Sequence, residues 1–148
     1  MSRPVFDMNV FVEYGKQIAK TDYAKMALSA VVLYELTATI IDKSLWQKYT
    51  AWRKYYEKGK LFLVPTSEDW WEAAKIASRI RHGEKSKAKG KTPKNPRTQR
   101  LENDILIAHT AFSRKFFVVT SNIEDFRKIQ QFLSVEIVSA DEYFSTEI

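Results

Sequence analysis

Four acidic residues stand where strands and helices of an α/β domain would meet, and their type suits metal chemistry. Asp7 follows a short apolar strand candidate, and Asp125 lies at the start of a predicted helix. Glu35 and Asp104 lie within or beside apolar helical stripes. Buried lone carboxylates are costly and clustered carboxylates repel one another, so a shared cation is the simplest way to stabilise them. Oxygen ligands of this kind favour Mg²⁺ or Mn²⁺.

Each acid also has an ordinary structural explanation when it is considered alone. Asp7 could cap the helix that follows it, and Asp125 could be a first-turn acid that the helix dipole favours. Glu35 could form a salt bridge, and Asp104 could pair with Arg100, four residues earlier. The joint placement of the four acids, rather than any one of them, supports a metal site.

The elements that must position these acids alternate along the chain. Apolar runs predict strands at residues 3–7, 26–29, 61–64, 116–119 and 135–138. Helical spacing of apolar residues predicts helices at 10–18, 31–41, 45–56, 66–81, 101–112 and 123–132, with a short turn at 141–144. This alternation indicates a three-layer α/β/α domain with a four- or five-stranded, mainly parallel sheet. Ligands of such sheets bind beyond the carboxyl ends of the strands, an edge that Asp7, Glu35 and Asp125 can reach.

Helix boundaries have recognisable signals. Ser29 can cap the helix after the second strand, and Gly59 can end the helix at 45–56. Thr66 and Asp69 stand in capping-box order. Glu13, Glu68 and Asp69 are therefore interpreted as solvated surface or capping acids.

The composition limits the class of protein. The chain has 148 residues and 45% hydrophobic content, which suits one domain over 1–148. It has no cysteines and two histidines, which excludes disulfides and thiolate chemistry and disfavours zinc. Asp7, Asn9 and Glu13 interrupt the apolar residues near the start, so no signal peptide or membrane span is expected. We expect a cytoplasmic protein.

The net charge of +6 is concentrated in one segment. Residues 79–100 hold nine basic residues and one acid. Positions 82–97 are rich in Lys, Gly and Pro, which predicts an exposed, mobile loop. Such a basic segment favours a polyanionic binding partner, with nucleic acid the first candidate. Binding to an acidic protein, or a role as a solvated linker, also fits the composition.

A second candidate surface is an aromatic cluster at helical spacing. Its members are Trp46, Tyr49, Trp52, Tyr55 and Tyr56. The cluster could stack bases, belong to the core or form a protein interface, and the interface is the preferred interpretation.

Four segments resemble the motifs of PIN domains in order and spacing, over essentially the whole chain. Val5-Phe6-Asp7-Met8-Asn9 resembles the opening strand, and residues 29–36 carry the family's helical Glu at Glu35. Residues 103–111 resemble its Asp-x-x-Ile-Ala-x-x-Ala helix, and residues 117–126 its Thr-x-Asn-x-x-Asp-Phe segment. Length and motif order look most like VapC-type toxins of toxin–antitoxin pairs.

The resemblance implies a Mg²⁺- or Mn²⁺-dependent endoribonuclease, a homodimer inhibited by a cognate antitoxin. Asp7, Glu35 and Asp104 would hold one ion, and Asp125 would help to hold a second or position water. The basic residues expected to contact RNA are Lys85, Lys87, Lys89, Lys91, Arg97 and Arg100. An alternative is a catalytically silent PIN-like module that binds RNA or protein. Phosphoryl-transfer receivers and haloacid-type phosphatases need acids that Asp7-Met8-Asn9 lacks.

Two positions depart from the family pattern. Met8 replaces the usual Thr, and Asn122 stands where many members have an acid. Asp125 is therefore the expected fourth carboxylate, with Asn122 as a weaker ligand or a hydrogen-bond donor. Asn9 and Thr120 are expected to support the ligands or a metal-bound water, although Thr120 and Asn122 could equally form a helix cap.

Overall fold

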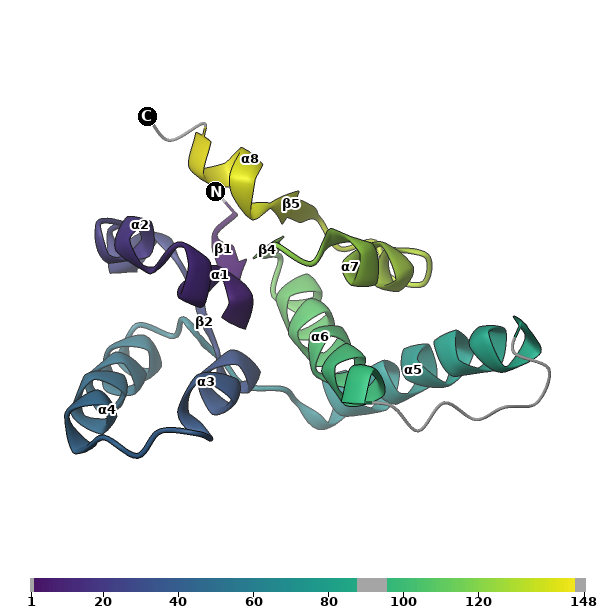
Figure 1. The fold of residues 1–148 in the computed structure, drawn as a ribbon, viewed down its shortest axis with the longest axis horizontal. Helices are drawn as coiled ribbons and strands as arrows, with labels where there is room; N and C mark the ends of the chain where they lie inside the picture. The colour runs from purple at the N-terminus through teal and green to yellow at the C-terminus, as the bar shows by residue number, and fades with distance from the viewer. Residues whose placement is uncertain (1, 88–95, 146–148) are drawn as a thin grey trace.

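The computed structural model describes residues 2–87 and 96–145, and strands and helices alternate along them (Figure 1). In chain order the elements are β1 (Pro4–Phe6), α1 (Met8–Glu13), α2 (Gly15–Ala19), a 3₁₀ turn (Tyr23–Lys25), β2 (Leu28–Ser29), α3 (Ala30–Thr37), α4 (Lys43–Lys58), β3 (Phe62–Leu63), α5 (Ser67–Lys87), α6 (Pro96–Ser113), β4 (Phe117–Thr120), α7 (Ile123–Gln130), β5 (Ile137–Ser139) and α8 (Ala140–Ser145). No helix in these two ranges is long and apolar enough to cross a bilayer.

The strands are parallel and form one continuous surface. β1, β4 and β5 pair in the order β1-β4-β5, and β2 pairs with β3. A parallel bridge between Val5 and Ala27, with the Ala27 amide donating to the Pro4 carbonyl at 3.0 Å, joins the two groups. The resulting order is β3-β2-β1-β4-β5, which confirms the predicted mainly parallel sheet.

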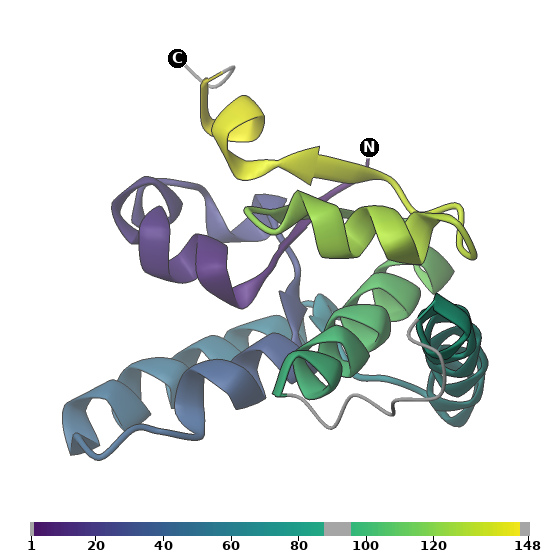
Figure 2. The same ribbon diagram turned by 45° about the vertical axis from the view of Figure 1, so that its right-hand side comes forward.

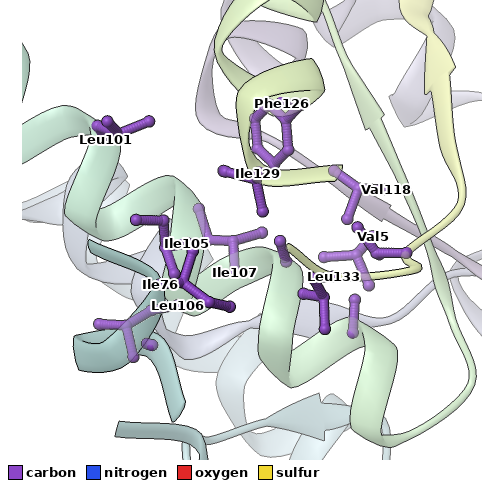
Figure 3. Packing of buried hydrophobic residues seen from close by; sticks show 14 of the residues in the cluster. Val5, Ile76, Leu101, Ile105, Leu106, Ile107, Val118, Phe126, Ile129 and Leu133 are labelled. Carbon is purple, nitrogen blue, oxygen red and sulfur yellow. The ribbon is translucent and has the colours of Figure 1, made fainter. Parts of the chain in front are cut away.

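Successive strand residues point to opposite faces, and this alternation builds two cores. Val5 and Val118 belong to the core beneath α5, α6 and α7, where Ile107 and Phe126 pack near them (Figure 3). The next residue of β1, Phe6, belongs to the other core, together with residues of α1, α2, α4 and α8. Figure 1 shows α5, α6 and α7 on one side of the strands and α1, α2 and α4 on the other. The three-layer α/β/α prediction is therefore confirmed.

The predicted helix over 10–18 is interrupted. Tyr14 leaves the helical region at φ −119° and ψ 26°, so α1 ends at Glu13 and α2 begins at Gly15. Glycine at this point lowers the helical propensity. Val10 and Ile18 still reach the same core, so the apolar spacing indicated the buried face correctly.

Both ends of the loop predicted at 82–97 are helical in the structure. Helix α5 continues to Lys87 and α6 begins at Pro96, which suits the first turn of a helix because proline lacks an amide hydrogen. The two helices pack against each other and an Arg81–Glu102 ion pair joins them, so packing extends them beyond their local propensity. Residues 88–95, which include Lys89 and Lys91, lie outside the described residues.

The predicted boundary signals are present. The Ser29 hydroxyl accepts the Val32 amide at 3.3 Å, and Gly59 is the C-cap of α4. The left-handed conformation that often follows a helix is adopted by the next residue, Lys60, at φ 60°. Thr66 and Asp69 form the reciprocal capping box, with amide-to-oxygen distances of 2.8 and 3.1 Å.

Asp69 does more than cap α5, contrary to the interpretation from sequence. Its side chain is 1% exposed and is contacted by His109 Nδ1 at 2.7 Å and by the Ser113 hydroxyl at 3.1 Å, both from α6. Burial alone would raise the pKa of Asp69, but the hydrogen bonds from Thr66, His109 and Ser113 outweigh it and hold the pKa below its ordinary value. The carboxylate therefore joins α5 to α6.

We expect Asp69→Ala to lower the free energy of unfolding by about 3 kcal/mol, because it removes a cap and leaves buried donors unsatisfied. A carboxyl with a lowered folded pKa stabilises the fold above its unfolded pKa, and this contribution is lost as the pH falls through the folded value. The difference from wild type should therefore shrink on acidification below about pH 4.

Urea unfolding at neutral and acidic pH measures this effect, with Glu68→Ala as the exposed control from the same turn. Equal stability of the two variants at neutral pH would contradict the role given to Asp69.

Candidate metal centre

A pocket of about 340 Å³ opens where β1 and β4 end. It is lined by Asp7, Met8, Asn9, Glu13, Glu35, Asp104, Ser121, Asn122 and Asp125. The structure therefore brings the four acids selected from the sequence to one place, together with Asn9 and Asn122. Thr120 reaches the same pocket through its bond to Asp7.

The strand order explains why the pocket forms there. The chain leaves β1 and forms β2 and β3 on one side, then returns to place β4 and β5 on the other side of β1. The connections therefore diverge between β1 and β4, which opens a crevice at their carboxyl ends. Asp7 follows β1, and Ser121 and Asn122 follow β4, so all three lie at this switch point.

Asp7 is held in a fixed position. Its Oδ1 accepts the Met8 amide at 2.8 Å and its Oδ2 accepts the Thr120 hydroxyl at 3.0 Å. The capping alternative for Asp7 is thus correct, and it coexists with the pocket position. The side chain is 4% exposed, and burial raises its pKa above the ordinary value although both hydrogen bonds act in the opposite direction.

A chain of hydrogen bonds continues from Thr120 to Asp125. The Thr120 hydroxyl accepts a hydrogen bond from the backbone amide of Asn122 at 2.9 Å, and the Asn122 side chain donates from Nδ2 to Asp125 Oδ2 at 2.8 Å. Asn122 is the N-cap residue of α7, but its side chain makes no capping bond to that helix. The helix-cap alternative is therefore correct for the position of Asn122 and wrong for its side chain, whose amide group positions the Asp125 carboxylate instead. Lys128 Nζ lies 3.9 Å from Asp125 Oδ1.

Glu35 and Asp104 approach the pocket from α3 and α6, which contact each other. Asn103 Nδ2 donates to Glu35 Oε2 at 3.5 Å across this contact. Asp104 is 5% exposed, so its carboxyl lies within the protein. The side chain of Arg100, its alternative partner, lies outside the described part of the chain.

Sequence reasoning missed two residues of the pocket. Glu13 is exposed, as expected for a surface acid, but it also lines the pocket and accepts the Ser121 hydroxyl at 3.2 Å. A signal was present, because Glu13 follows Asn9 by four residues and so shares its helical face. No comparable signal marked Ser121.

The donor set fits a hard divalent cation in type and charge. Five carboxylates line the pocket, and none of the described residues that line it is basic. Such oxygen-rich sites suit Mg²⁺ or Mn²⁺, and a cation would relieve the cost of ionising Asp7. Within residues 2–87 and 96–145, however, no three acidic or histidine side chains stand close enough together to hold one ion. Shared coordination therefore requires the side chains to rotate inward.

The aromatic cluster divides between the core and the surface. Tyr56 is 1% exposed, and Trp52 packs on Phe11 at a ring distance of 5.8 Å. Tyr49 contacts Trp52 at 5.3 Å, and both are partly buried against the same core as Tyr56. Trp46 and Tyr55, by contrast, are about half exposed.

Comparison with known proteins gives structural matches only. No family model and no curated protein matches this sequence. One chain of DNA-bound VapBC from Salmonella typhimurium aligns with a TM-score of 0.53 and 21% identity, over 95% of this chain and 99% of that one. A chain of FitAB bound to the IR36 DNA fragment aligns with a TM-score of 0.51 and 18% identity, over 93% and 94%. A chain of VapBC2 from Rickettsia felis, bound to a DNA fragment from its promoter, aligns with a TM-score of 0.51 and 18% identity, over 92% of this chain and 97% of that one.

The chain has a PIN-like fold. The resemblance drawn from the four sequence segments is confirmed at this level, and the near-complete coverage on both sides shows that the PIN-like fold spans the chain.

We expect Asp7→Asn to raise the free energy of unfolding by about 1 kcal/mol in metal-free buffer, because it removes a buried charge among other carboxylates while retaining an acceptor for Met8. Thermal unfolding in EDTA measures the change. Asp22→Asn is the control, since Asp22 is a capping acid of the 3₁₀ turn outside the pocket, and it should leave stability nearly unchanged. A less stable Asp7→Asn would show that the ionised carboxylate is fully satisfied within the fold.

Proposed function

We propose that the chain is a divalent-metal-dependent endoribonuclease and the toxin of a toxin–antitoxin pair. The observation that carries the proposal is that five carboxylates line one pocket at the switch point of a PIN-like sheet. Since phosphates are anions, five carboxylates would repel an RNA strand unless a cation stood between them. The pocket therefore suits phosphodiester chemistry only together with a metal.

Asp7, Glu35 and Asp104 are proposed to hold the metal, with Asp125 near a second position. When bound, the metal would lower the pKa of a water molecule and neutralise charge on the phosphate. The chain's own groups orient the ligands: Met8 and Thr120 fix the Asp7 carboxylate, and Asn122 fixes that of Asp125.

The partners follow as part of the same proposal. The structurally similar VapBC and FitAB are complexes bound to DNA. For this chain we propose a cognate antitoxin, a homodimeric assembly and action on RNA in the cytoplasm.

Nuclease activity is tested with an end-labelled RNA in Mg²⁺, Mn²⁺ or EDTA. We expect cleavage only with metal, and a loss of at least about 100-fold in Asp7→Asn and Asp104→Asn, because each removes a charged ligand. Glu124→Gln is the matched control, an exposed acid beside Asp125 that does not line the pocket, and it should cleave like wild type.

Full activity in both pocket variants would reject the assignment. RNA binding without metal-dependent cleavage in wild type would instead favour the catalytically silent module.

The basic segment remains a proposed RNA guide. Replacing Lys85, Lys87, Lys89 and Lys91 by Gln should weaken RNA affinity and lower the slope of log K against log salt by about 0.7 for each phosphate that the segment no longer binds. Fluorescence anisotropy over a salt series measures both quantities. The control removes four basic residues elsewhere, Lys16, Lys20, Lys25 and Lys115. Identical slopes for the two quadruple variants would exclude specific guidance by this segment.

A further inference from the structure

Helix α4 and the two residues that follow it carry an excess of positive charge. Between Lys43 and Lys60 the chain has six basic residues and a single acid, Glu57. All six basic residues are exposed. Glu57 pairs with Arg53 at 2.7 Å, so the segment keeps an excess of exposed lysines.

The core uses only one side of the helix. Tyr49, Trp52 and Tyr56 follow one another at helical spacing and pack inward. Lys48 lies over the Tyr49 and Trp52 rings, with its Nζ 5.6 and 5.1 Å from their centroids. Trp46 lies off this stripe and is 47% exposed, so packing does not account for it.

Trp46 and Lys54 bound a shallow hollow of about 350 Å³ on the outer face of α4. Its remaining lining residues are Gln47, Thr50 and Ala51. Because Trp46, Thr50 and Lys54 are each four residues apart, they lie along one line of the helix surface, about 12 Å from end to end. The hollow thus offers an aromatic plane at one end, small or hydroxyl side chains along its floor and an ammonium group at the other end.

We propose that this face of α4 binds single-stranded RNA, with a base stacked on Trp46 and the phosphate backbone contacted by Lys54 and the flanking lysines. The inference rests on the proposed function, to which it adds a substrate-binding surface and a preference for unpaired RNA. Exposed aromatic planes between cations suit single strands, because the bases of a duplex are already stacked on one another.

The position of α4 agrees with this role. Helix α4 packs beside α3, which contributes Glu35 to the pocket, and Figure 2 shows the two helices running side by side. A strand bound on α4 is therefore held next to a helix of the candidate metal centre.

A second exposed aromatic site provides the contrast. Trp71 on α5 is 63% exposed and has Lys75 Nζ 5.5 Å from its ring centroid, but Lys75 is paired with Glu72 at 3.1 Å. The local charge is therefore balanced, and this tryptophan lacks the excess of cations found on α4. Trp71→Ala is accordingly the matched control for Trp46→Ala.

The test measures binding of a short fluorescein-labelled oligouridine to the full chain in EDTA, where metal-dependent cleavage is prevented. We expect Trp46→Ala to weaken affinity about tenfold, the loss of one base stack, and Trp46→Phe to retain most of it. Trp71→Ala should bind within about twofold of wild type. Lys54→Gln should lower the slope of log K against log salt by about 0.7, the value for one phosphate on a single strand.

Equal affinities for Trp46→Ala and Trp71→Ala, with an unchanged slope for Lys54→Gln, would overturn the inference and leave this face to a protein partner. Circular dichroism of each variant shows whether it is folded, and Trp46 is exposed enough for the substitution to be tolerated. Binding in EDTA is independent of cleavage, so Trp46-dependent binding without nuclease activity would reject only the proposed function. Metal-dependent cleavage with Trp46-independent binding would reject only the inference.

Discussion

The hydrogen bond from the Thr120 hydroxyl to the Asp7 carboxylate joins the ends of β1 and β4, and the arrangement of the candidate site depends on it. The same hydroxyl accepts the Asn122 amide, and Asn122 in turn donates to Asp125. Parallel pairing of β1 with β4 sets the positions of these groups, because Phe6 lies opposite Val119 and the next residues are Asp7 and Thr120. A one-residue shift in this register would place Asp7 and Thr120 on opposite faces of the sheet.

Two buried aspartates show how the same residue type can serve different ends. Asp69 accepts bonds from Thr66, His109 and Ser113, and its pKa lies below the ordinary value. Asp7 accepts one amide and one hydroxyl, and burial leaves its pKa raised. The first carboxylate is satisfied by the protein and stabilises the fold. The second retains an energetic cost that a cation could relieve, which is the expected trade between stability and function at a binding site.

Local signals in the sequence were sufficient for much of the fold. The strand around Val5 and Phe6, and the caps at Ser29 and Thr66, depend on near neighbours and were predicted correctly. The acids Asp7, Glu35, Asp104 and Asp125 were selected because packing did not explain them, and they do line one pocket.

Apart from the local break of the predicted 10–18 helix at Tyr14, the errors concern contacts between segments far apart in the sequence. Asp69 meets His109 forty positions later, and Glu13 meets Ser121 more than a hundred positions later. No pattern within one helix reveals such partners. The lengths of α5 and α6 were likewise underestimated, because the mutual packing of the two helices outweighs the low propensity of residues such as Gly83.

The central claim is that the acid-lined pocket binds a divalent cation, and anomalous diffraction from crystals soaked in Mn²⁺ tests it most directly. The account predicts an anomalous peak inside the pocket at coordination distance, roughly 2.2 Å, from carboxylate oxygens of Asp7 and Asp104. Crystals saturated with Mn²⁺ that show no peak there, with Asp7 and Asp104 unmoved, would contradict it.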